Sequence, residues 1–138
     1  MTARRDSSAV ETSNQSPGVR TVDDGIRRGE IYSAELHGCA GAAGMVTRPV
    51  LVIQNDIGNR YSRSIIVASV TSTRPSHDFA VVVEIPPETL PGLAAICLNQ
   101  IMMVDRGSLG KKLASLPPET MAAADEALRR SLGLSRNG

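Results

Sequence analysis

The stretch RPVLVIQNDIGNRYSRSIIVASVTS, residues 48–72, contains two apolar segments separated by a polar hinge. The first segment covers residues 49–53 and the second covers residues 65–70. Both are short and rich in Val and Ile, a composition typical of buried β-strands. A cation, Arg48, stands immediately before the first segment, and a hydroxyl, Thr71, stands immediately after the second. The stretch therefore predicts two strands with one polar side chain at the outer end of each.

The same kind of segment recurs along the chain between residues 29 and 104. The further segments are GEIYSAEL, AVVVEI and AICLNQIMMV, each bounded by Gly, Pro, Asn or Asp. Such spacing predicts a small sheet or barrel, and the uninterrupted apolar runs favour strands that are buried on both faces. The hinge NDIGNRYS has Asn, Asp and Gly suited to a turn with positive φ. The later segment RGSLGKKLASL is compatible with a helical turn or with a short strand.

The C-terminal segment PPETMAAADEALRRSLGL predicts one helix. Pro117 and Pro118 suit its start, where missing N–H groups are tolerated, and Gly133 suits its end. An apolar stripe recurs at steps of three and four: Met121, Ala124, Leu128 and Leu132. Two acid–base pairs are spaced i,i+4: Asp125–Arg129 and Glu126–Arg130. The expected fold is mainly β, of the α+β class, with one C-terminal helix.

Length and composition limit the possible functions. The 138 residues suit one domain, with a polar disordered tail over residues 1–26 and the folded domain over residues 27–138. A net charge of +1 gives no global basic field, and 2% aromatic residues argue against a base-stacking platform. Two cysteines, Cys39 and Cys97, are too few for a disulfide framework and favour a reducing cytoplasm. No apolar run approaches the roughly 18 residues that a membrane span needs.

Few side chains are candidates for chemistry. Arg48 precedes a proline and could fork onto a phosphate, although an arginine in a solvated loop is the commoner case. Thr71 and Ser72 could donate to a phosphate oxygen or could simply stabilise a turn. His77 could act as a general base or be an exposed loop residue. The carboxylates Asp56, Asp78, Glu84 and Asp105 are scattered at strand ends, and none forms the cluster that a two-metal nuclease needs. No metal or other cofactor is expected.

Several motifs together resemble one known family. They are, in order, RRGEIYSAEL, a loop containing glycines, TRPVLVIQNDIGNRYS, IIVASVTS, NQIMMVDRGSLGKKLASL and ETMAAADEALRRSLGL. This sequence is similar to the MazF/PemK family of toxin endoribonucleases over residues 27–134. The resemblance implies an SH3-like barrel related to the CcdB fold. It also implies a homodimer that an antitoxin of the MazE type inhibits by laying an extended segment over the RNA groove.

The resemblance assigns roles to the two outer residues. The family's catalytic Arg corresponds to Arg48 and its catalytic Thr to Thr71, and adjacent strands bring these ends together at one edge of the barrel. The implied reaction is metal-independent attack of an RNA 2′-OH on the adjacent phosphate, giving a 2′,3′-cyclic phosphate and a 5′-OH. Cleavage of mRNA in this way blocks translation and growth. Arg48 would stabilise the developing charge and act as an acid, while the general base stays open because a guanidinium is effectively always protonated.

Two departures from the family pattern affect RNA recognition. The loop segment GAAGMV lacks the acid and the amide that many relatives carry there, and Met102 stands where relatives often have an Arg. Both leave the recognised RNA sequence open, and Asn55 and Gln100 are further candidates for polar groups of the RNA groove. The alternative function is a CcdB-like protein that poisons DNA gyrase without cutting RNA. Because that branch acts through its C-terminal helix, the presence of both Arg48 and Thr71 favours the ribonuclease.

Overall fold

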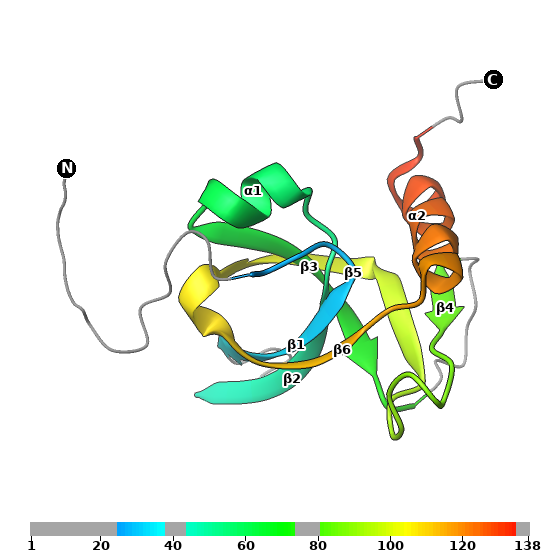
Figure 1. Cartoon of the computed structure of the whole chain (residues 1–138), viewed down its shortest axis with the longest axis horizontal. Coiled ribbons are helices and arrows are strands. Elements are labelled where there is room, and N and C mark those ends of the chain that lie inside the picture. The colour runs from blue at the N-terminus through cyan, green and yellow to red at the C-terminus, as the bar shows by residue number, and fades with distance from the viewer. Residues whose placement is uncertain (1–24, 38–43, 74–80, 135–138) are drawn as a thin grey trace, which may run out of the picture.

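The structure of the chain is a computed structural model that describes residues 25–37, 44–73 and 81–134 (Figure 1). Its elements, in order, are β1 (Glu30–His37), β2 (Met45–Val52), α1 (Asp56–Tyr61), β3 (Ser64–Thr71), β4 (Val82–Glu84), β5 (Ala95–Asp105), the 3₁₀ turn η1 (Arg106–Ser108), β6 (Leu109–Ser115) and α2 (Pro118–Leu132). Every predicted strand segment is a strand. The segment that the sequence left ambiguous contains both a 3₁₀ turn and a strand.

The six strands form one antiparallel sheet in the order β4-β5-β3-β2-β1-β6. One apolar cluster takes side chains from both β5 and β6, which three other strands separate in the sheet. The three residues of η1 join β5 directly to β6 although these strands are far apart in the sheet, so the sheet must curl. We call the face that carries this cluster the inner face. Its buried members are Ile26, Tyr32, Ala34, Leu36, Val50, Val52, Ile65, Val67, Val104 and Leu109. The curled sheet confirms the prediction of a small, mainly β barrel.

The opposite, outer face of the sheet carries a second apolar cluster, against which α2 packs. Leu51, Ala68 and Ile96 are fully buried there, together with Ala124 and Ala127 of α2. Successive strand residues point to opposite faces, so Val50 belongs to the inner cluster and Leu51 to the outer one. Burial on both faces explains why the central strands are continuous apolar runs instead of alternating with polar residues.

Helix α2 follows its sequence signals with two exceptions. It starts with Pro118 at its first position and ends at Gly133, whose φ of 71° is the left-handed C-cap conformation. Leu132, predicted to lie on the buried stripe, is 55% exposed. The Glu126–Arg130 pair forms at 3.8 Å. Asp125 instead pairs with Arg28 at 2.8 Å, because the long-range partner lies closer than its i,i+4 neighbour.

The hinge between β2 and β3 is a helix and not the predicted turn with positive φ. Asn55 caps α1, because its side-chain oxygen accepts a hydrogen bond from the Gly58 N–H at 2.8 Å. Asp56 places a negative charge in the first turn, where the helix dipole favours it. The same residue types that suit a turn therefore start a helix here, because a capped helix satisfies more backbone N–H donors than an isolated turn does.

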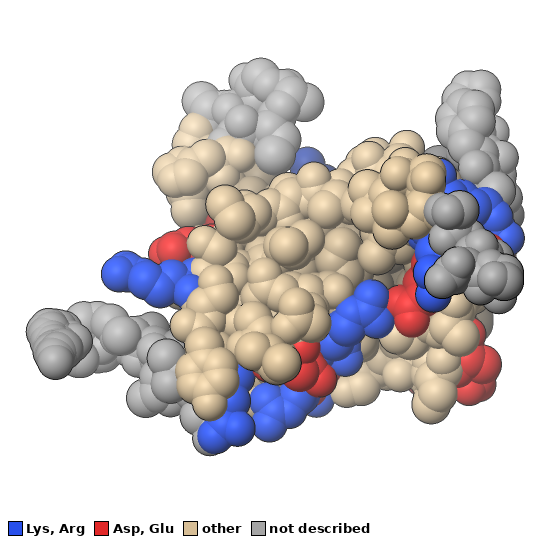
Figure 2. Space-filling view, turned by 90° about the horizontal axis from the view of Figure 1, so that it is seen from above, with Lys and Arg blue, Asp and Glu red and all other residues tan. Residues whose placement is uncertain are grey.

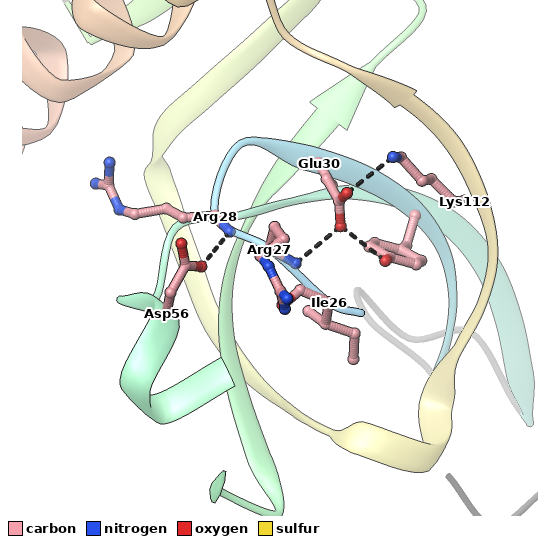
Figure 3. A network of polar contacts seen from close by, with 7 residues as sticks. Ile26, Arg27, Arg28, Glu30, Asp56 and Lys112 are labelled. Carbon is pink, nitrogen blue, oxygen red and sulfur yellow. Dashed lines mark hydrogen bonds and ion pairs between the residues drawn. The ribbon is translucent and has the colours of Figure 1, made fainter. Parts of the chain in front are cut away.

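Residues just before β1 connect the barrel to both helices (Figure 3). The carboxylate of Glu30 accepts hydrogen bonds from the Arg27 N–H and the Tyr32 hydroxyl, both at 2.8 Å, and pairs with Lys112 at 2.8 Å. The Arg28 N–H donates to Asp56 of α1, while its guanidinium pairs with Asp125 of α2. A carboxylate as buried as Glu30 is tolerated because donors surround it.

The surface on the side of α1 has few charges. Figure 2 shows a broad area without Lys, Arg, Asp or Glu on the face seen from above. Exposed large apolar side chains include Ile57 and Tyr61 of α1, and Ile66 and Met103 of the sheet. Ile66 and Met103 are paired in register across β3 and β5. None of the helices in the described ranges is both long enough and apolar enough to cross a membrane.

Candidate active site

Arg48 and Thr71 stand at the outer ends of two neighbouring strands. The ladder between β2 and β3 pairs Val50 with Ser69 and continues inward from there. Arg48 lies two residues before Val50 and Thr71 lies two residues after Ser69, so both side chains lie on the inner face with Val50. The two predicted residues are therefore at the same end of the strand pair, just beyond its last paired residues.

Pro49 explains why this end stays open. The β2–β3 pairs begin at Val50, whereas β2 is paired with β1 over its whole outer part, from Met45 to Leu51. A proline has no N–H to give to a ladder, so the pairing with β3 stops beside it. Arg48 and Thr71 consequently lie where two extended strands run on without a ladder between them.

The surroundings of Arg48 leave its guanidinium available. The residue is exposed, and no hydrogen bond or ion pair joins its guanidinium to any other residue that the structure describes. Its register partner on β1 is Ala34, which is small and fully buried and offers no competing charge. An unpaired guanidinium beside an open strand end is suited to binding a phosphate through its fork of N–H donors.

The hydroxyl of Thr71 makes a local turn with Thr73. Its oxygen accepts a hydrogen bond from the Thr73 N–H at 3.1 Å, and the hydroxyl donates to the Thr73 carbonyl oxygen at 3.0 Å. This is the turn chemistry that the sequence offered as an alternative to a phosphate contact. The two are compatible, because the N–H bond holds the oxygen in place while the hydrogen can rotate toward a phosphate oxygen.

The other predicted site residues are spread over the fold. Ser72 is exposed and follows Thr71 directly, while His77 lies outside the described residues. Asn55 is at the opposite end of β2 from Arg48, where it caps α1. Gln100 is exposed in β5, at the bulge where the pairing with β3 shifts between Ala68 and Ser69. Of these four, only Ser72 is shown beside the pair of Arg48 and Thr71.

The sheet register also brings a carboxylate into the same row as Thr71. Thr71 pairs with Ala95 of β5, and Ala95 pairs on its other side with Glu84 of β4. Glu84, Ala95 and Thr71 therefore form one row across three neighbouring strands. The sequence placed Glu84 among the carboxylates at strand ends but could not place it in line with Thr71, because strand register depends on the packing of the whole sheet.

The opposite end of β2 and β3 is closed by hydrogen bonds. The Asn59 side chain, 1% exposed, donates to the Gln54 carbonyl at 2.8 Å and to Asp56 at 3.0 Å. The buried Arg106 guanidinium donates to the carbonyls of Ser62 and Asn59. The pKa of Asp56 is held below its ordinary value, chiefly by the hydrogen bond from the Arg28 N–H. Distant segments meet here to stabilise α1.

The free cysteine Cys97 is buried in β5. Burial raises the pKa of the Cys97 thiol and makes it a poor nucleophile. Within the described ranges, no group of three or more His, Cys, Asp or Glu side chains is placed to hold a metal ion.

Known proteins share both the sequence and the fold. Endoribonuclease EndoA of Bacillus subtilis (strain 168) is 40% identical over 111 residues, which cover 79% of this chain and 96% of that protein. A mycobacterial endoribonuclease solved with its cognate antitoxin has a TM-score of 0.67 at 24% identity and matches 80% of this chain and 98% of that chain. A MazE–MazF complex from Deinococcus radiodurans has a TM-score of 0.66 at 21% identity and matches 80% of this chain and 98% of that one.

The likeness to the solved structures shows only that the fold is shared, whereas the match to a family model shows that the chain belongs to a family. The model of the PemK-like, MazF-like toxins of type II toxin–antitoxin systems matches residues 27–132. That range contains every strand, both helices and the open end with Arg48 and Thr71. The chain belongs to the PemK-like, MazF-like family of toxins of type II toxin–antitoxin systems.

Proposed function

We propose that this toxin is an endoribonuclease that cuts single-stranded RNA, mRNA above all, at the open end of β2 and β3. Arg48 binds the scissile phosphate and stabilises the charge that develops on it, and Thr71 donates a hydrogen bond to a non-bridging oxygen. The observation that supports the proposal is the pairing of β2 with β3, which leaves Arg48 and Thr71 at the outer ends of neighbouring strands and on the same face. The likeness to EndoA, which is named as an endoribonuclease, supports the same activity.

The proposed reaction forms a bond between the 2′ oxygen and phosphorus and breaks the bond to the 5′ oxygen. The products are a 2′,3′-cyclic phosphate and a 5′-OH, and no metal is required. A guanidinium placed beside the phosphate contributes where negative charge develops, which is the largest single term in many enzymes. In this proposal Arg48 also gives a proton to the departing 5′ oxygen.

The experiment incubates a long single-stranded RNA of diverse sequence with the purified protein in EDTA. Cut positions are mapped by primer extension, and the end groups are identified by mass spectrometry. We expect recurrent cuts with cyclic phosphate and 5′-OH ends, and loss of these cuts in Arg48→Ala. Arg63→Ala is the matched control, because Arg63 is an exposed arginine at the other end of β3. Intact RNA after incubation with the wild type would overturn the proposal.

The partner that we propose is an antitoxin of the MazE type that covers the RNA groove with an extended segment. Two of the similar solved structures contain such a partner, one described as a cognate antitoxin and one as MazE. Adding the purified antitoxin to the cleavage assay should abolish the cuts at a stoichiometric ratio. No observation on the described residues supports the alternative function, poisoning of DNA gyrase. If that alternative were correct, growth arrest would persist when Arg48→Ala is expressed.

We also propose that the toxin is a homodimer and acts in the cytoplasm, where its RNA substrate lies. The exposed pair of Ile66 and Met103 supports self-association, because large apolar side chains gathered on one face favour burial in an interface. Sedimentation analysis of the purified protein tests the dimer. Ile66→Lys should shift the distribution toward the monomer.

A further inference from the structure

We propose that Asn99 is a specificity-determining residue of the same site: together with Gln100, its amide hydrogen-bonds to an adenine of the RNA strand that is cut. The inference rests on the proposed function, because it needs RNA to be bound at the open end of β2 and β3. Contacts to phosphate carry no information about base sequence, so Arg48 and Thr71 cannot by themselves select a cutting position.

Strand β5 contains a bulge opposite β3. Ala68 pairs with Ile101, whereas the next residue of β3, Ser69, pairs with Cys97. Residues 98–100 of β5 therefore have no pairing partner on β3. Bulges change the direction of side chains and are over-represented beside active sites, so we define residues 98–100 as the β5 bulge and consider what it presents.

The β5 bulge presents two amides on the side of the inner face. Leu98 and Ile101, at its two borders, both pack in the outer cluster. Asn99 follows Leu98 and Gln100 precedes Ile101, and successive strand residues point to opposite faces. Both amides are therefore directed away from the outer cluster, and both residues are exposed.

The inner face of β3 connects the β5 bulge with Thr71. Ile65 and Val67 belong to the buried inner cluster, whereas Ser69 and Thr71, further along the same face, carry hydroxyls and are only half-buried. The face thus changes from apolar core to accessible polar surface at Ser69, which is level with the bulge. Strand spacing and rise place the bulge roughly 10 Å from Thr71. A base next to a phosphate bound at Thr71 can reach an amide at that separation.

The two amides are available for a ligand. The side chains of Asn99 and Gln100 form no hydrogen bond with any other residue that the structure describes. The amides near α1 are used within the fold: Gln54 donates to a carbonyl of β3, Asn55 caps the helix and Asn59 donates to a backbone carbonyl. Because each amide carries N–H donors beside a carbonyl acceptor, the bulge offers both kinds of group to a base edge.

This combination of groups matches adenine. An Asn or Gln amide can donate to N7 of adenine and accept from its N6 amino group at the same time. Guanine presents two acceptors on the same edge, which suit Arg or Lys instead. The bases of single-stranded RNA are unpaired, so these edges are open to side chains. One such bidentate contact corresponds to a preference of about tenfold to a hundredfold over other bases.

The experiment first maps the cuts that the full-length wild type makes in a diverse RNA. We expect adenine to be enriched at one fixed position close to the cut phosphate. Four oligoribonucleotides that differ only at this position are then cut under single-turnover conditions. Affinity is measured with four matching analogues that carry a 2′-deoxyribose at the cut and cannot react. Wild type should favour adenine by about tenfold to a hundredfold in affinity and in cleavage at subsaturating protein.

Asn99→Asp tests the residue itself, because it keeps the shape and replaces the N–H donor by a second acceptor. A carboxylate accepts from the cytosine amino group but cannot donate to N7, so the preference for adenine over cytosine should fall by about tenfold or more. Ser115→Asp is the matched control, since it adds the same charge at an exposed position on the edge strand β6, and should keep the wild-type preference. Melting curves show whether each variant is folded. Asn99→Ser, which lacks the amide, takes the place of Asn99→Asp if that variant is unfolded, and should lose the preference for adenine.

Two outcomes would overturn the assignment of Asn99. They are wild-type cuts without adenine at any fixed position, and an adenine preference that stays within threefold of wild type in a folded Asn99 variant. If Arg48→Ala is inactive in either case, the proposed ribonuclease site stands and only the base-reading role of the β5 bulge is excluded. If the wild type fails to cut RNA at all, the proposed function fails first, and with it the role of Asn99.

Discussion

The two ends of the strand pair β2 and β3 differ in how their polar groups are satisfied. At the α1 end, the side chains of Asn59 and Arg106 are buried and hydrogen-bonded to backbone carbonyls. At the other end, Arg48 is exposed and has no partner among the described residues, and the ladder stops beside Pro49. The first end has the properties of a structural support and the second those of a binding site.

The contrast shows how a small barrel combines rigidity with reactivity. A buried polar group costs free energy unless it is paired, so the network of the α1 end is complete. An exposed cation at a strand end costs little free energy when no phosphate is bound. Substitutions at the two ends should therefore affect different properties, stability at one and cleavage at the other.

The largest expected effect is at the open end. Arg48→Ala should reduce the single-turnover cleavage rate by at least about a thousandfold, since a donor aimed at developing charge is worth 10²–10³ and the phosphate also loses its cation. The melting temperature should stay within about 2 °C, as expected for an exposed side chain without partners. A large drop in melting temperature would show that Arg48 supports the fold and would weaken the comparison.

The next effect is at the α1 end. Asn59→Ala should lower the free energy of unfolding by about 2–3 kcal/mol, because it removes a buried amide that donates to the Gln54 carbonyl and to the Asp56 carboxylate. Chemical denaturation measures this change. Arg60→Ala, on the exposed side of the same helix, is the control and should be nearly neutral. Cleavage by the folded fraction of Asn59→Ala should persist. A complete loss of cleavage would contradict the assignment of stability to the α1 end and of cleavage to the other end.

A smaller effect is expected at Thr71. Thr71→Val keeps the shape and removes the hydroxyl, and should slow cleavage by about tenfold to a hundredfold, the worth of one hydrogen bond to a charged group. Thr71→Ser keeps both the hydroxyl and the turn with Thr73, and should stay near the wild-type rate. Equal rates for the Val and Ser variants would show that the hydroxyl serves only the turn.

The smallest effect concerns acid stability at the α1 end. The folded-state pKa of Asp56 is lower than its unfolded value, mainly through the Arg28 N–H. Its ionised form therefore stabilises the fold at neutral pH, and this contribution is lost as the pH falls below about 4. Asp56→Asn should be less stable than wild type at pH 7 and closer to it at pH 3. A constant difference between the two in melting curves would contradict this assignment.

Much of the fold could be predicted because its signals are local. Val-rich and Ile-rich segments predicted the strands, and Pro118 and Gly133 marked the ends of α2. The hinge was predicted wrongly, since Asn55 and Asp56 suit both a turn and a helix cap and only the completed helix decides between them. Leu132 was predicted to be buried, but the last turn of α2 extends beyond the sheet it covers. The Arg28–Asp125 pair joins residues too far apart for any local signal.

The sequence by itself determined which segments form strands, which residues bear reactive groups and which family the motifs resemble. Those properties depend on composition and short-range order, which the chain carries whether or not it is folded. The end of the β2–β3 ladder beside Pro49, and the row that joins Glu84, Ala95 and Thr71, became visible only in the folded structure. Strand register is set by the packing of both faces of the sheet at once, and that packing exists only in the folded barrel.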